Sequence, residues 1–158
     1  MTTSVLDHVT DTDRRWMRRA IELSRRCPPV DRAYNVGAVI VTAAGEELSW
    51  GYSRETDAHV HAEESALAKL AADDPRLATA TLYSTLEPCS QRRSRRLTCT
   101  QLVLGAGLPR VVIAWREPAL FVADCVGVEA LAAAGVVVLE TPELADAART
   151  VNSHLALP

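Results

Sequence analysis

The chain has 158 residues, which suits one domain with a substantial core and is short for two. Hydrophobic residues make up 48% and the mean hydropathy is +0.02, values typical of a globular protein. No apolar run approaches the roughly 20 residues that cross a bilayer, and the first residues lack a secretory pattern, so we expect a cytoplasmic protein. The net charge of −3 argues against a strongly basic nucleic-acid binder.

The basic residues and the cysteines restrict the interpretation further. Lys69 is the single lysine among 17 basic residues, a skew that we attribute to a GC-rich genome rather than to function. The cysteines are Cys27, Cys89, Cys99 and Cys125. Cytosolic cysteines are more often metal ligands or core residues than disulfide partners. We interpret Cys27 and Cys125 as structural thiols.

The first elements are a helix and a hairpin. An apolar stripe at helical spacing predicts a helix over residues 13–26, with Asp11 or Thr12 as its cap. An apolar, β-branched run predicts a buried strand over 36–42, and a turn leads from it into a second strand over 47–52.

The rest of the chain alternates between helix and strand. The predicted elements are a helix at 61–72, a strand at 80–86, a helix at 97–105, a strand at 110–115, a helix at 127–134, a strand at 136–139 and a terminal helix at 142–155. A hairpin followed by βαβ units predicts one mixed sheet of five strands with helices on both faces. We therefore expect residues 1–158 to form a single three-layer α/β/α domain.

Two short segments carry the residues that could bind a metal or take part in catalysis. His61-Ala-Glu63 opens a predicted helix, and Pro88-Cys89 ends a predicted strand before Cys99. One histidine and two cysteines are the nitrogen and sulfur ligands that zinc prefers, and three protein ligands leave the fourth position open, as in catalytic sites. Glu63 is placed to hold a proton beside that open position. The same residues are also compatible with a structural zinc in a pseudoenzyme, in which Glu63 would be dispensable.

These segments resemble the His-x-Glu and Pro-Cys signature of zinc nucleobase deaminases, and the chain is identified as a member of the cytidine deaminase superfamily over roughly residues 12–140. The runs Asn35-Val-Gly-Ala-Val-Ile-Val, Thr85-Leu-Glu-Pro-Cys-Ser and Val111-Val-Ile-Ala-Trp-Arg-Glu-Pro are most similar to one branch, the pyrimidine deaminase of riboflavin biosynthesis. The resemblance implies the cytidine-deaminase-like fold, zinc held by His61, Cys89 and Cys99, and Glu63 as the proton shuttle. It also implies a homodimer or homotetramer.

The loop between the two cysteines departs from this branch. The typical His-x-Gly-(Arg or Lys)-Thr-Pro-Pro is replaced by Gln91-Arg-Arg-Ser-Arg-Arg-Leu-Thr, which is one residue longer, and Asn35 is displaced from the usual asparagine position. We expect substrate contacts from Asn35, Gln91, Arg93, Arg95 and Trp115. Two alternatives stay open for the arginines, which either clamp a phosphate or form a solvated loop.

The predicted substrate is a small heterocyclic amine, possibly phosphorylated, with the diaminopyrimidine ribosyl phosphate of riboflavin synthesis as the first candidate. A cytosine, guanine or secondary-metabolite type of amino-heterocycle is the alternative. An RNA-binding or editing module that uses the arginine loop is a third interpretation. An aromatic content of 4% argues against it, because RNA readers need stacking platforms. His59 is a competing candidate for the histidine ligand.

Overall fold

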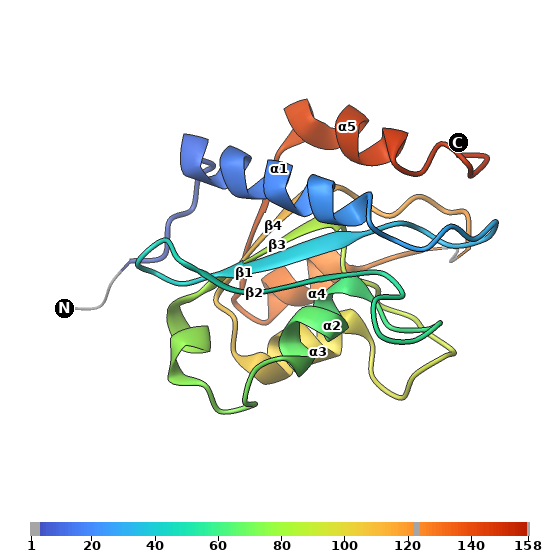
Figure 1. The fold of residues 1–158 in the computed structure, drawn as a ribbon. Coiled ribbons are helices and arrows are strands. Elements are labelled where there is room, and N and C mark those ends of the chain that lie inside the picture. Colours follow the sequence, from blue (N-terminus) through green and yellow to red (C-terminus); the bar gives the residue numbers. More distant parts are fainter. Residues whose placement is uncertain (1–3, 122–123, 158) are drawn as a thin grey trace.

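The architecture is built on one mixed five-stranded sheet (Figure 1). The computed structural model describes residues 4–121 and 124–157. The strands lie in the order β2-β1-β3-β4-β5, with β1 antiparallel to β2 and β3, and β3, β4 and β5 parallel. Their bounds are β1 Gly37–Val41, β2 Glu47–Tyr52, β3 Thr81–Leu86, β4 Arg110–Trp115 and β5 Val137–Glu140. The predicted hairpin and parallel units are therefore confirmed.

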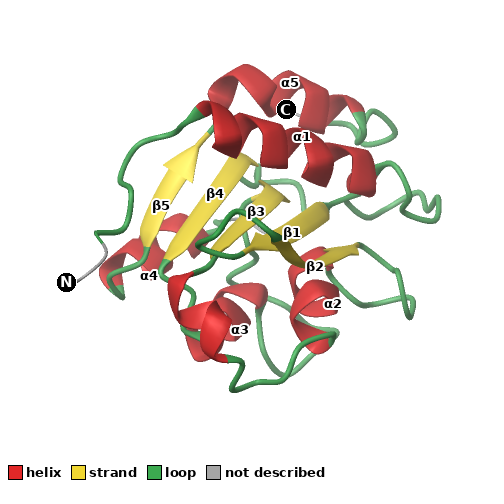
Figure 2. Ribbon diagram, turned by 60° about the vertical axis from the view of Figure 1, so that its left-hand side comes forward, coloured by secondary structure: helices red, strands yellow, loops and turns green. Residues whose placement is uncertain are grey.

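Helices cover both faces of the sheet. Figure 2 shows α1 and α5 on one side and α2, α3 and α4 on the other, which is the predicted three-layer α/β/α arrangement. Their bounds are α1 Asp11–Ser24, α2 Ala62–Ala68, α3 Cys99–Ala106, α4 Gly127–Ala133 and α5 Ala145–Thr150. No helix within the described ranges is long and apolar enough to cross a bilayer.

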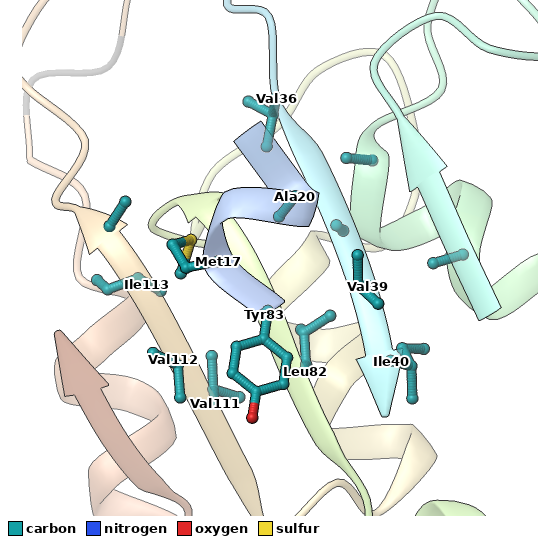
Figure 3. Close-up of a cluster of buried hydrophobic side chains, with 14 of the residues drawn as sticks. Met17, Ala20, Val36, Val39, Ile40, Leu82, Tyr83, Val111, Val112 and Ile113 are labelled. Atoms are coloured by element: carbon teal, nitrogen blue, oxygen red, sulfur yellow. The ribbon is translucent and has the colours of Figure 1, made fainter. Parts of the chain in front are cut away.

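The core lies between the sheet and its helices. Every residue of β1 and β4 is buried, as expected for apolar, β-branched strands covered on both faces. Figure 3 shows Met17 and Ala20 of α1 over the strands that carry Val39 and Ile113. Side-chain alternation along β3 directs Tyr83 toward α1 and Ser84 toward α2. The face that carries Ser84 is the one on which α2, with His61 at its N-cap and Glu63 in its first turn, lies.

Four helices differ from their predicted bounds by two residues or more. The predicted 13–26 helix begins at Asp11 and ends at Ser24. The predicted 61–72 helix ends at Ala68, because Asp74 caps a separate 3₁₀ turn over Pro75–Thr79. The 97–105 helix starts later, at Cys99, where Thr98 provides the cap. The terminal 142–155 helix is a 3₁₀ turn followed by the short α5.

The cap of α1 and the end of α5 have side-chain causes. Thr10, not Asp11 or Thr12, caps α1, because its hydroxyl accepts from the Asp13 N–H while Asp13 accepts from the Thr10 N–H. Beyond α5, the Asn152 side chain donates to the carbonyl of Asn35 and accepts from its N–H. These bonds tie the chain after α5 to the loop before β1 instead of continuing a helix.

Candidate active site

Three secondary-structure boundaries bring the predicted metal ligands together. His61 is the N-cap of α2, Cys89 follows β3, and Cys99 is the first residue of α3. The ligand atoms of these three residues all lie within 4.8 Å of one another. His61 Nδ1 is 3.6 Å from Cys89 Sγ and 3.3 Å from Cys99 Sγ.

This donor set fits a tetrahedral zinc ion. Zinc–sulfur and zinc–nitrogen bonds of about 2.3 and 2.0 Å place tetrahedral ligand atoms roughly 3.5 Å apart, close to the observed spacing. The Cys99 N–H also donates to Cys89 Sγ across 3.3 Å. The hydrogen bond between the two thiols lowers the pKa of Cys89 to about 4 and raises the pKa of Cys99. The lowered pKa of Cys89 favours the thiolate, which is the form that binds zinc.

Glu63 is buried beside this cluster. The residue is 4% exposed, and the Ser84 hydroxyl donates to Glu63 Oε1 across 2.6 Å. Burial raises the pKa of Glu63, while the Ser84 hydrogen bond acts in the opposite direction. A carboxyl group with a raised pKa takes up and releases a proton more readily near neutral pH.

A cavity of about 480 Å³ connects these groups to the surface. Its lining includes His61, Glu63, Cys89, Gln91, Arg92 and Arg93. The cavity is in the size range of small-molecule sites. Its walls combine apolar surface with a few polar groups, so it suits a planar heterocycle.

The predicted substrate residues divide into two groups. Gln91 and Arg93 line the cavity, whereas Asn35, Arg95 and Trp115 are not among the lining residues. The Asn35 amide donates to the Val151 carbonyl and its oxygen accepts from Arg54.

Arg95 and Trp115 are likewise engaged elsewhere. Arg95 is paired with Asp57 and Glu64. Trp115 is buried, and its ring packs edge-on against Tyr34 with centroids 6.2 Å apart.

The remaining histidine and cysteine candidates lie outside the metal cluster. Among the described residues, the cluster contains His61 and not His59, although His59 lines the cavity. Cys27 is buried and donates to the Val36 carbonyl. Burial raises the pKa of Cys125 to about 12, so this thiol stays protonated. The interpretation of Cys27 and Cys125 as structural thiols is consistent with both environments.

Several cavity residues were missed by the sequence analysis. Tyr34, Arg54 and Glu117 line the cavity, and Tyr34 packs edge-on against Phe121. Burial raises the pKa of Glu117 to about 7. The signal for Glu117 was its place two residues after the end of β4, at the same edge of the sheet as Glu87.

Glu87 fixes the surroundings of Cys89. Its carboxylate accepts from the backbone N–H groups of Glu117 and Val128 at 3.0 and 2.9 Å. At the start of α4, a Cβ on Gly127 would meet the Pro88 carbonyl oxygen at 2.1 Å, so this close approach requires glycine. The strand end that carries Cys89 is therefore held from two sides.

Curated proteins of riboflavin biosynthesis are similar to this chain in sequence. A diaminohydroxyphosphoribosylamino-pyrimidine deaminase of Schizosaccharomyces pombe is 43% identical over 127 residues, which are 79% of this chain and 31% of that protein. The riboflavin biosynthesis protein RibD of Escherichia coli is 37% identical over 107 residues, 67% of this chain and 28% of that protein. The chain thus spans about a third of the length of the curated relatives it matches.

Solved structures share the fold. A diaminohydroxyphosphoribosylaminopyrimidine deaminase/5-amino-6-(5-phosphoribosylamino)uracil reductase of Thermotoga maritima superposes with a TM-score of 0.75 at 32% identity, over 89% of this chain and 39% of that one. The Rib2 deaminase of Aspergillus oryzae has a TM-score of 0.75 at 23% identity, over 88% of this chain and 89% of that one. The cytidine-deaminase-like fold expected from the sequence is confirmed.

The family match covers the predicted metal ligands and Glu63. The cytidine and deoxycytidylate deaminase zinc-binding region matches residues 10–115. This range includes the three clustered ligands and the buried glutamate whose geometry is described above. The chain therefore belongs to the cytidine and deoxycytidylate deaminase zinc-binding family.

Proposed function

We propose that this chain is a zinc-dependent hydrolytic deaminase, and that diaminohydroxyphosphoribosylaminopyrimidine is its substrate. The observation that carries the reaction type is the position of Glu63, buried in the same cavity as His61 and Cys89. The substrate is supported by the name of the fission-yeast relative that is 43% identical. Residues 1–158 would act as one catalytic unit, in the cytoplasm and as a homodimer or homotetramer.

The ligand set would be His61 Nδ1, Cys89 Sγ and Cys99 Sγ. Zinc held there supplies Lewis acidity, which makes water a competent nucleophile near neutral pH. Glu63 accepts a proton from this water and transfers it to a ring nitrogen of the substrate. After water oxygen has added to the amino-bearing carbon, Glu63 delivers the second water proton to the amine. The carbon–nitrogen bond breaks, and ammonia and a ring carbonyl result.

Ser84 supports both protonation states of Glu63. Its hydroxyl lies 2.6 Å from Glu63 Oε1 and 2.8 Å from the Leu86 carbonyl oxygen. A hydroxyl has one proton to donate and two lone pairs. It donates to the ionised carboxylate, and it turns to the Leu86 carbonyl while it accepts from the protonated acid. The general acid–base group thus keeps a hydrogen bond throughout the cycle.

Recognition of the substrate is assigned to two residues of the loop that follows Cys89. Gln91 offers an amide to the edge of the heterocycle, and Arg93 offers a cation to the phosphate. Both line the cavity and both are exposed, so they are accessible to a ligand from solvent. Arg93 has no ion-pair partner among the described residues, which leaves its charge available.

The test is ammonia release from the diaminopyrimidine ribosyl phosphate by the zinc-loaded chain. Wild type and Glu63→Gln are compared at equal zinc content, since loss of the proton-transferring carboxylate is expected to lower the rate by roughly 10²–10⁴-fold. The dephosphorylated compound, cytidine, deoxycytidylate and guanine are run in parallel. Turnover that requires Glu63 and prefers the phosphorylated pyrimidine supports the proposal.

Other outcomes reject defined parts of it. Turnover of another amino-heterocycle alone would reject the substrate and keep the deaminase. No turnover of any compound, with zinc retained in both proteins, would favour the pseudoenzyme. Salt-sensitive RNA binding in a gel-shift assay would favour the RNA-binding alternative.

A further inference from the structure

The loop between the two cysteines lacks backbone support of its own. Residues 91–97 take part in no backbone–backbone hydrogen bond among the described residues. The side chains of Gln91, Arg93 and Arg96 make no hydrogen bond to the rest of the described fold either. Only Arg92 and Arg95 connect this segment to other described elements. Two side chains thus provide the hydrogen bonds that hold this segment to the rest of the described fold.

Arg92 makes the more buried of these connections. Its side chain is 2% exposed, and its Nη2 donates to the His59 carbonyl at 2.5 Å and to Glu64 Oε1 at 2.9 Å. Nε donates to the Ser94 hydroxyl within the loop at 3.1 Å. Nη1 is buried without a hydrogen-bond partner among the described residues, so the guanidinium is held through Nε and Nη2.

Glu64 joins this arginine to a metal ligand. The same Oε1 that accepts from Arg92 also accepts from the His61 backbone N–H at 3.2 Å, as the reciprocal part of a capping box at the start of α2. The other oxygen accepts from Arg95 Nε at 3.3 Å. One carboxylate therefore links the residue that presents the imidazole to the segment that ends at Cys99.

We propose that Arg92 and Glu64 form a clasp that fixes the loop between Cys89 and Cys99 against the His61 end of α2 and thereby sets zinc affinity. Both are positioning residues, since neither is a member of the metal cluster. The clasp rests on the proposed zinc ligands and not on the identity of the heterocycle. It gives the arginine-rich loop a role besides phosphate binding, because the charge of Arg92 is already paired with Glu64.

The expected effect follows from the geometry of the ligands. Zinc requires all three donor atoms at fixed distances, and outer contacts that orient ligands typically alter metal affinity by about 10–100-fold. Removing Arg92 leaves the loop with the more exposed Arg95 contacts and leaves Glu64 without its closest cation. Arg96 supplies a matched control from the same loop, since it is exposed and makes no such contact within the described residues.

The test measures zinc affinity of the full chain by competition with a chromogenic chelator. Starting from zinc-loaded protein, Arg92→Met, Glu64→Gln, the double variant and the control Arg96→Met are compared. We expect about 10–100-fold weaker binding for Arg92→Met and wild-type binding for Arg96→Met. Because the two residues act as one unit, the double variant should lose less than the product of the single effects. Equal affinity of Arg92→Met and Arg96→Met, or fully multiplicative losses, would overturn the proposal.

Two further measurements separate positioning from simple stabilisation. A purely structural Arg92 would lower the Tm of the zinc-free protein and leave zinc affinity unchanged, and this result counts against the clasp. Arg92→Lys keeps the positive charge and loses the planar guanidinium with its several donors. This variant replaces Arg92→Met in the comparison if the methionine variant does not fold. It should bind zinc at least about threefold more weakly than Arg96→Met. Since no substrate enters these assays, failure of the proposed substrate leaves their outcome unaffected.

Discussion

Tyr83 and Ser84, which are neighbours in β3, each donate a hydrogen bond to a buried carboxyl group on opposite faces of the sheet. The two carboxyl groups differ in whether a cation is paired with them. On the α1 face, the Tyr83 hydroxyl donates to Asp13, which Arg110 also binds through two nitrogens at 2.7 and 2.8 Å. On the α2 face, Ser84 donates to Glu63, which forms no salt bridge with a cation among the described residues. One region pairs its buried charge, and the other does not.

The pKa values follow this difference. Burial opposes ionisation of Asp13, but hydrogen bonds from Arg110, Tyr83 and Thr10 outweigh it and lower the pKa. In the cavity, burial raises the pKa of both Glu63 and Glu117. The fold therefore pairs Asp13 with a guanidinium, whereas Glu63 and Glu117 line the cavity without an ion-pair partner among the described residues, as is common for groups with raised pKa values at functional sites.

The largest effect is expected from breaking the paired region. Arg110→Met removes the cation from Asp13 and also the bonds to the carbonyls of Leu6 and His8, which hold the chain before α1. Loss of one partner from a buried ion pair typically costs about 3–5 kcal/mol of stability. Urea unfolding should show this loss, while the zinc affinity of the folded protein stays within about threefold of wild type. A large drop in zinc affinity would show that the two regions are coupled.

A smaller, pH-dependent effect is expected at Glu117. Its pKa is raised to about 7 by burial, so the folded state binds a proton more tightly than the unfolded state does. Wild-type stability contributed by this group is therefore present at low pH and is lost as the pH rises from about 4.5 to 7. Glu117→Gln removes this dependence. The free energy of unfolding of the variant minus that of wild type should rise by roughly 2 kcal/mol from pH 5 to pH 8, as measured by urea unfolding. If the difference in stability between the two proteins were the same at both pH values, a raised pKa of Glu117 would be contradicted.

The two regions also differ in how far the sequence predicts them. The strands and the ligand set follow from local patterns, namely apolar β-branched runs and the His61-Ala-Glu63 and Pro88-Cys89 segments. The Asp13–Arg110 pair joins residues 97 positions apart and leaves no local signal. The same limit applies to the wall of the cavity, where Tyr34 and Glu117 meet only through packing of loops on the finished sheet.

Long-range pairing also explains which arginines the sequence could not assign. Arg92, Arg93, Arg95 and Arg96 are equivalent in composition, and their roles separate only once Glu64 and Asp57 are in place. Asn35 offers a similar case, because its side chain is occupied by Arg54 and by the carbonyl of Val151. Local sequence identifies the residue types that a site needs, whereas competition from neighbours decides which of them remain available.

The smallest effect is expected at Arg95, which tests whether burial decides the strength of the loop contacts. Its side chain is 33% exposed and its partner Asp57 is 48% exposed, whereas the Arg92 side chain is 2% exposed. Exposed ion pairs contribute about 0–1 kcal/mol, because water screens the charges. Arg95→Met should therefore cost less than about 1 kcal/mol in urea unfolding and change zinc affinity by less than about threefold. If it weakened zinc binding as strongly as Arg92→Met, the number of arginine contacts to Glu64, and not their burial, would set the position of the loop.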